Sequence, residues 1–327
     1  MEAQIEQIAK EANLDIKEIG IVPPHNPNLI LSKEYKKTLE TIEQLVNLGE
    51  PVLIQGHAGV GKNQAICEVA HKLNKKVIKI NCTGDMKTST LIGRINAVIE
   101  TDKVTGEKRT VITWQDGLIP LCLKNEYWLV MDEVNSLDPD ILFVLHGLLD
   151  DGYLTIANNS EIIKAKPGFR ILATMNPNYH GVKSLNQAFI DRWSVIEMDF
   201  DKVVDAKLLE RMNAPEPVRK AVESLIKKIR ERYDTEDITQ NFGHRTLDKV
   251  VVLSKVFTIP EAMDMAFANK LPIHERGAVK TLIKELAQEI DRVEKTVTTE
   301  GNVDAKVKES ALTPEAILDQ LMGKSKP

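Results

Sequence analysis

Cysteine, aromatic residues and long apolar runs are all scarce in this chain of 327 residues. Its three cysteines, Cys67, Cys82 and Cys122, are too few and too scattered for a disulfide framework or a CxxC site. We therefore expect reduced thiols and a cytoplasmic protein. No apolar run approaches the roughly 20 residues that a membrane span needs, and the polar, acidic start is not typical of a secretory signal. We expect no membrane partner.

Charge of one sign is also not in large excess, since the formal net charge is −5. This acidic balance argues against a surface built to coat nucleic acid, although it allows a local basic patch. Aromatic residues make up only 5% of the chain, which disfavours base-stacking platforms. The seven histidines show no HExxH or HxxxH spacing, so a catalytic zinc site is disfavoured as well.

The pattern of apolar residues divides the chain into four parts. Between residues 51 and 200, short apolar runs typical of buried strands alternate with helical patterns, and two further segments have the pattern of hairpins. After residue 201 only helical periodicity remains. The alternation predicts a three-layer α/β fold with a parallel sheet. We expect an N-terminal helix and extended connector (1–32), an α/β core with two hairpin inserts (33–200), an all-helical domain (201–295), and a polar linker with a short C-terminal helix (296–327).

A glycine-rich stretch, GHAGVGKN at residues 56–63, lies between a strand pattern and a helix pattern and fits GxxxxGK. Glycines let such a loop turn its backbone N–H groups toward phosphates, while the helix N-terminus and the lysine add positive charge. The string alone could occur by chance, but the strand before it and the helix after it are what a phosphate-binding P-loop requires. The candidate nucleotide-binding residues here are Gly56, His57, Ala58, Gly59, Val60, Gly61, Lys62, Asn63 and Gln64.

Asn63 departs from the P-loop pattern, which has a serine or threonine hydroxyl as a Mg²⁺ ligand at this position. An amide oxygen can bind Mg²⁺ with a different reach and geometry. Either the site hydrolyses nucleotide with altered metal handling, or it binds nucleotide and hydrolyses it weakly. The first alternative is favoured because further candidate catalytic residues follow.

Acidic residues end a second apolar strand, in the sequence YWLVMDE at residues 127–133. Asp132 is a candidate nucleotide-site residue and, together with Asn63, a candidate Mg²⁺ ligand. Glu133 is a candidate base that orients and deprotonates the attacking water. A third apolar strand, in FRILATMNP, ends in Asn176, which could hydrogen-bond the attacking water or the γ-phosphate.

These motifs, with SLNQAFIDRW and GHRTL after them in this order, resemble the AAA+ ATPases. More narrowly they resemble the MoxR-type group with its CbbQ, CobS and GvpN relatives, because LIGR, a hairpin and WQDGLIPLCLKN precede DEVN and ATMNP. The resemblance covers residues 51–257. It implies the fold of a P-loop NTPase core followed by a helical lid.

By this resemblance, Lys62 matches the Walker A lysine, Asp132 and Glu133 the Walker B pair, and Asn176 sensor 1. Arg192 matches the arginine finger, which acts on the nucleotide of a neighbouring subunit. The second candidate catalytic arginine, Arg245, matches sensor 2 on the lid. Simpler roles for these arginines are a salt bridge of Arg192 with Asp191, and for Arg245 a place in the first turn of a helix, paired with Asp248 or with solvent.

The resemblance implies ATP and Mg²⁺ as cofactors and a homo-oligomeric ring, expected to be a hexamer. It also implies a partner with a von Willebrand A-type domain, and a chaperone-like task such as metal or cofactor insertion or activation of a complex. Two alternatives stay open. One is a nucleotide-dependent DNA-handling factor, which the acidic charge disfavours, and the other is a weakly hydrolysing nucleotide switch, which Asn63 suggests.

Overall fold

The chain divides into two compact units after Asp199 in a computed structural model. The structure describes residues 20–101, 108–176 and 185–300. The helices expected at the two ends of the chain, at residues 2–13 and 313–323, lie outside these ranges. No helix in the described ranges is long and apolar enough to cross a membrane.

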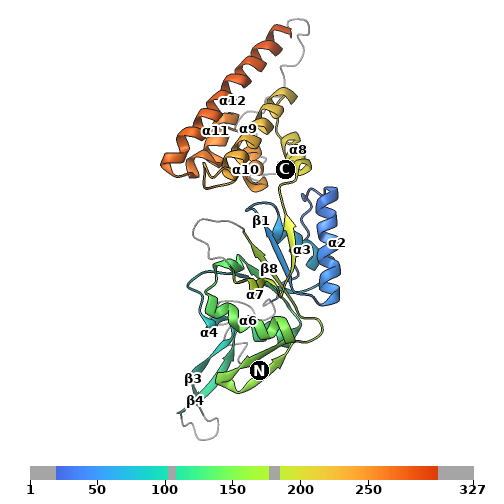
Figure 1. Ribbon diagram of the computed structural model, residues 1–327, viewed down its shortest axis with the longest axis vertical. Helices are drawn as coiled ribbons and strands as arrows, with labels where there is room; N and C mark the ends of the chain where they lie inside the picture. The colour runs from blue at the N-terminus through green and yellow to red at the C-terminus, as the bar shows by residue number, and fades with distance from the viewer. Residues whose placement is uncertain (1–19, 102–107, 177–184, 301–327) are drawn as a thin grey trace, which may run out of the picture. The chain divides into compact units, whose positions relative to one another are not determined.

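A five-stranded parallel sheet forms the centre of the first unit (Figure 1). Its spatial order is β2 (Val77–Asn81), β5 (Trp128–Asp132), β8 (Arg170–Met175), β1 (Val52–Gly56) and β9 (Ser194–Met198). Because all five strands run in the same direction, their carboxyl ends share one edge of the sheet. The expected parallel α/β core is confirmed.

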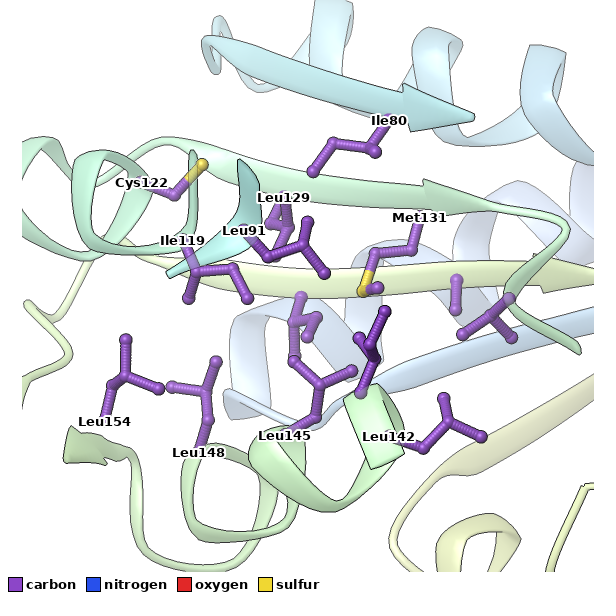
Figure 2. Packing of buried hydrophobic residues seen from close by; sticks show 14 of the residues in the cluster. Ile80, Leu91, Ile119, Cys122, Leu129, Met131, Leu142, Leu145, Leu148 and Leu154 are labelled. Atoms are coloured by element: carbon purple, nitrogen blue, oxygen red, sulfur yellow. The ribbon is translucent and has the colours of Figure 1, made fainter. Parts of the chain in front are cut away.

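Helices cover both faces of this sheet, as the continuous apolar character of its inner strands requires. The first unit contains α2 (Lys33–Leu48), α3 (Lys62–Lys72), α4 (Thr88–Leu91), α5 (Leu118–Asn125), α6 (Pro139–Asp151) and α7 (Gln187–Ile190). α2 and α3 pack on one face of the sheet. On the other face, Leu142, Leu145 and Leu148 of α6 belong to one buried cluster with Leu129 and Met131 of β5 (Figure 2).

Local signals in the sequence set the ends of these helices. Ser32 caps the N-terminus of α2 by accepting the N–H of Tyr35, and Gly49 ends the helix with a φ of 87° that suits glycine. Asp138 and Pro139 begin α6 in the same way, and Gly152 ends it. Both helices therefore begin and end at residues that are favoured as caps.

Two antiparallel hairpins interrupt the α/β alternation, as predicted. The first pairs β3 (Gly93–Thr101) with β4 (Lys108–Asp116), and the second pairs β6 (Tyr153–Ile156) with β7 (Glu161–Lys164). The edge strand β9, in contrast, was not predicted. Only alternate residues of β9, Ile196 and Met198, are buried, so its pattern is weaker than the continuous apolar runs of the inner strands.

The second unit is all-helical, as expected from its periodicity. It contains α8 (Lys202–Glu210), α9 (Glu216–Asp234), α10 (His244–Leu253), α11 (Ile259–Ala266) and α12 (Ile273–Glu300). In its core, the ring centroids of the buried Phe242 and Phe267 side chains lie 5.1 Å apart. α12 continues to Glu300, beyond residue 295, which is the expected end of the helical domain.

Candidate nucleotide site at the carboxyl edge of the sheet

Close packing and backbone conformation explain the glycines at the end of β1 and in the loop between β1 and α3. A Cβ atom on Gly56 would lie 2.0 Å from the carbonyl oxygen of Met198, so β9 leaves no room for a side chain. Gly59 and Gly61 have φ values of 87° and 102°, in the left-handed region that glycine adopts without strain. The loop therefore turns tightly from β1 into the N-terminus of α3.

Lys62, the first residue of α3, points its ammonium group into this loop and is only 8% exposed. Its Nζ donates to the carbonyl oxygens of Gly56 at 2.6 Å and His57 at 2.9 Å. It also donates to Oδ1 of Asn176 at 2.7 Å. Two backbone carbonyl oxygens and one amide oxygen thus accept from this buried cation, and an anionic phosphate would be a stronger acceptor than any of the three.

The order of the strands brings the ends of β5 and β8 next to the loop. Asn176 follows β8, which lies between β1 and β5. The Asn176 amide bridges two candidate residues, because its Oδ1 accepts from Lys62 and its Nδ2 donates to Oε1 of Glu133 at 3.3 Å. Asn135 fixes the backbone here by donating to the Asn176 carbonyl at 3.0 Å.

The Asp132 carboxylate is surrounded by donors from three elements. The hydroxyl of Thr174 donates to Oδ1, while Nδ2 of Asn63 donates to Oδ2 at 2.7 Å. Nζ of Lys79 lies 2.9 Å from the same Oδ2. Burial favours the protonated acid, but the donors outweigh it, so the pKa of Asp132 is lowered and the carboxylate is ionised near neutral pH.

Glu133 differs from Asp132 in exposure and in backbone conformation. It is exposed, and its φ of 58° lies in the left-handed region, which is uncommon for residues other than glycine. The Glu133 N–H donates to the Thr174 hydroxyl at 3.3 Å, which supports this conformation. The turn presents a carboxylate to solvent beside Asn176, as a base acting on water would need.

The oxygens at this edge fit a magnesium ion. Oδ1 of Asn63 is buried and has no hydrogen-bond partner among the described residues, and it lies on the side chain that already contacts Asp132. Mg²⁺ uses one or two protein oxygens and completes its shell with waters and phosphates. The described residues contain no cluster of three or more His, Cys, Asp or Glu side chains suited to a metal, so such a shared shell is the arrangement that fits.

The structure thus brings together Lys62, Asn63, Asp132, Glu133 and Asn176. Gln64 lies one residue further along α3 and donates to Glu68 at 2.8 Å.

Sequence reasoning missed Thr174 and Lys79, although both contact Asp132. The available signal for Thr174 was weak: it is a polar residue in an apolar strand, two positions before Asn176. Lys79 gave no signal, because its contact depends on β2 pairing with β5.

Arg192 lies near the amino-terminal ends of the strands, whereas the loop lies at their carboxyl ends. It precedes β9, whose first residue, Ser194, pairs with Val52 at the start of β1. Its Nε is 2.7 Å from Oδ1 of Asp150 in the last turn of α6, and its guanidinium also donates to the Ala188 carbonyl. The carboxylate partner of Arg192 is therefore Asp150 and not Asp191, which was the expected alternative. The structure does not bring Arg192 to the nucleotide loop of its own chain.

Arg245 belongs to the second unit, in the first turn of α10. Its side chain is exposed, and within the described part of the chain it forms no ion pair with Asp248. The residue before it, His244, is buried and accepts the backbone N–H of Asp201 at its Nε2, at 3.2 Å.

Comparison with known proteins finds a family model that matches the part of the chain with the loop and the strand ends. Residues 51–193 match the model of the AAA domain (dynein-related subfamily). An uncharacterized protein of Staphylococcus epidermidis is 30% identical over 262 residues, which cover 78% of this chain and 93% of that protein. An uncharacterized protein of Staphylococcus aureus strain USA300 is 28% identical over 267 residues, covering 79% and 94%.

Solved structures align less closely. The crystal structure of NtrX from Brucella abortus in complex with ADP is 15% identical, with a TM-score of 0.39, and the alignment covers 69% of this chain and 51% of that chain. A similarity this low supports no inference about function. The AAA-domain match coincides with the parallel sheet, the P-loop and the acidic strand end, and the chain belongs to the AAA+ ATPase family.

Proposed function

We propose that this protein binds and hydrolyses ATP as a ring-forming AAA+ ATPase and uses the reaction to remodel or activate a partner protein. One observation carries the proposal: Asn176 contacts both the buried Lys62 and the exposed Glu133 at the edge where Asp132 also lies. A phosphate-binding cation, a metal-binding carboxylate and a candidate base for water are thus within one hydrogen-bonded group.

Each of these residues has a distinct part in the proposed hydrolysis. Lys62 exchanges its carbonyl partners for phosphate oxygens and offsets their negative charge. Glu133 takes a proton from the attacking water, and Asn176 holds that water or the γ-phosphate in position. Asp132 and Oδ1 of Asn63 hold Mg²⁺. When bound, that ion neutralises charge developing on the phosphates.

The position of Arg192 supports action between subunits. The length of β1, about 3.3 Å per residue, separates the edge with Arg192 from the edge with the loop. An arginine that contacts nucleotide from there does so on another copy of the chain. With the sequence resemblance, this extends the proposal to a MoxR-type ATPase in a hexameric cytoplasmic ring, acting in a chaperone-like manner on a target with a von Willebrand A-type domain.

Phosphate release from Mg-ATP, measured over a wide range of protein concentration, tests this function. We expect the specific activity to rise with concentration as subunits assemble. Glu133→Gln should abolish turnover while ATP binding stays unchanged. Retained turnover in that variant would remove Glu133 as the base, and a wild-type chain that binds no ATP would refute the whole proposal.

The second candidate function is a nucleotide switch with weak hydrolysis, and the Asn63 contact favours it. The Asn63 amide donates to Asp132, whereas a serine or threonine hydroxyl in the P-loop pattern faces the metal. If this contact suppresses hydrolysis, Asn63→Thr should raise the rate of phosphate release at least tenfold with little change in ATP affinity. An unchanged rate in Asn63→Thr would leave the ATPase proposal as it stands and remove the switch.

A further inference from the structure

Lys79 is a charged residue at the candidate nucleotide site with no place in the proposed reaction. It lies in the edge strand β2 between Ile78 and Ile80, both buried. Since β2 pairs with β5 and Asn81 is opposite Asp132, the Lys79 side chain extends along the sheet toward this carboxylate. Its Nζ reaches Oδ2 of Asp132 at 2.9 Å while the side chain stays 40% exposed.

The contact with Lys79 occupies one of the acceptor positions on the Asp132 carboxylate. Each carboxylate oxygen offers two lone pairs. Oδ2 receives Nδ2 of Asn63 and Nζ of Lys79, so protein donors fill it, whereas the Thr174 hydroxyl is the single donor to Oδ1 within the described ranges. A metal ion or a metal-bound water that approaches Oδ2 has to displace one of the two donors.

Of these two donors, Lys79 is the one that competes by charge. Asn63 is neutral and belongs to the P-loop, and its buried Oδ1 belongs to the same amide group that contacts Asp132. Lys79 is a full positive charge, and an ammonium group close to the carboxylate lowers the attraction of that carboxylate for a second cation. Lys79 also has a long side chain with exposed atoms, so it can move into solvent when it leaves Asp132.

We infer that Lys79 forms an ion pair with Asp132 in the absence of metal and that the divalent ion displaces it. Lys79 thereby sets the Mg²⁺ concentration at which the site binds nucleotide. This inference rests on the proposed function, since it assigns Asp132 to the metal. Lys79 is in this sense a positioning residue, because it acts through Asp132 and not on the reacting atoms.

The experiment is a Mg²⁺ titration of the binding of a fluorescent ATP analogue, which needs no turnover. Lys79→Met should lower the half-saturating Mg²⁺ concentration about tenfold, the size expected for removing one charge at contact distance in a solvated site. Lys79→Arg keeps the charge and should stay within about twofold of the wild type by the same reasoning. Lys72→Met is the matched control, because Lys72 forms its ion pair with Glu43, at a distance of 2.6 Å, and not with Asp132.

The possible results separate the two proposals. An unchanged or higher half-saturating concentration in Lys79→Met, with ATP binding intact in the wild type, overturns the role of Lys79 and leaves the proposed ATPase standing. A wild-type chain that binds no ATP at any Mg²⁺ concentration overturns both. A shift of similar size in Lys72→Met would mean that general surface charge is responsible, which also overturns the inference. Thermal unfolding of Lys79→Met and of a second variant, Lys79→Gln, checks that at least one of them is folded.

Discussion

At the scale of single residues, His244 shows how a buried group ties chain segments together within the second unit. Its Nε2 accepts the backbone N–H of Asp201 and lies 3.4 Å from Oδ1 of Asp205. Arg230 pairs with both oxygens of Asp205, at 2.6 and 3.0 Å, and its guanidinium lies 4.1 Å from the ring centroid of Phe200. Burial lowers the pKa of His244 below 6.5; Asp205 and Asp201 oppose this effect, and Arg230 adds to it.

This lowered pKa predicts a pH dependence of stability. Between the folded pKa of His244 and its value of about 6.5 in the unfolded chain, the unfolded state binds more protons. The free energy of unfolding of the second unit should therefore fall as the pH drops below 6.5, and His244→Gln should show a smaller loss. Urea unfolding at pH 7.5 and pH 5.5, followed by circular dichroism of the helices, measures both. An equal loss in the two proteins would contradict the prediction.

The residues of the candidate site were predictable to different degrees. Local sequence was enough to predict that four of them share one edge of the sheet. Each lies at or just after the end of a strand, or begins a helix, within a motif: Lys62, Asp132, Glu133 and Asn176. Thr174 and Lys79 contact Asp132 only because β8 and β2 lie on the two sides of β5. No local pattern encodes that strand order.

At the scale of elements, packing between α4 and α5 depends on one glycine. A Cβ atom on Gly117, which precedes α5, would lie 2.6 Å from the carbonyl carbon and oxygen of Leu91 at the end of α4. Backbone atoms cannot rotate away as a side chain does. The N–H of Gly117 also donates to the Ile92 carbonyl at 3.0 Å.

We therefore expect Gly117→Ala to lower the free energy of unfolding of the first unit by about 1–3 kcal/mol, the usual cost of overpacking. Gly277→Ala is the control: Gly277 lies inside α12, and a Cβ atom there would meet no heavy atom within 4 Å, so alanine should stabilise that helix by up to about 1 kcal/mol. Denaturant unfolding of both variants makes the comparison. A Gly117→Ala protein as stable as the wild type would show that α4 shifts freely.

Elements with strong local signals were the ones that the sequence predicted. The inner strands are continuous apolar runs, the two hairpins alternate, and α2 and α6 have caps at both ends. β9 was missed because Val195 is 41% exposed and Glu197 points outward to Gln55, which leaves only two buried residues in the strand. A short edge strand of this kind is defined by its pairing with β1 more than by its own composition.

At the scale of the whole molecule, the separation of Arg192 from the loop of its own chain predicts complementation between subunits. A Lys62→Ala chain should not bind nucleotide productively, and an Arg192→Ala chain should not complete a neighbour's site. A mixture of the two inactive variants should regain about a quarter of the wild-type rate, if subunits exchange at random and each active interface needs one intact residue from each side. Phosphate release against the mixing ratio measures this, with Asp191→Ala in place of Arg192→Ala as the control. A mixture that stays inactive would argue against action in trans.

The strand order also has a consequence for how the protein is made. β1, which leads into the P-loop, pairs only with β8 and β9 among the described strands. During synthesis Val52, Leu53 and Ile54 leave the ribosome long before either neighbour exists, so the nascent chain carries an unpaired apolar strand until β8 and β9 follow. The nucleotide loop therefore takes its shape only after β8 and β9 have been made, although its own residues are made much earlier, and a chain that stops before residue 170 would lack both neighbours of β1.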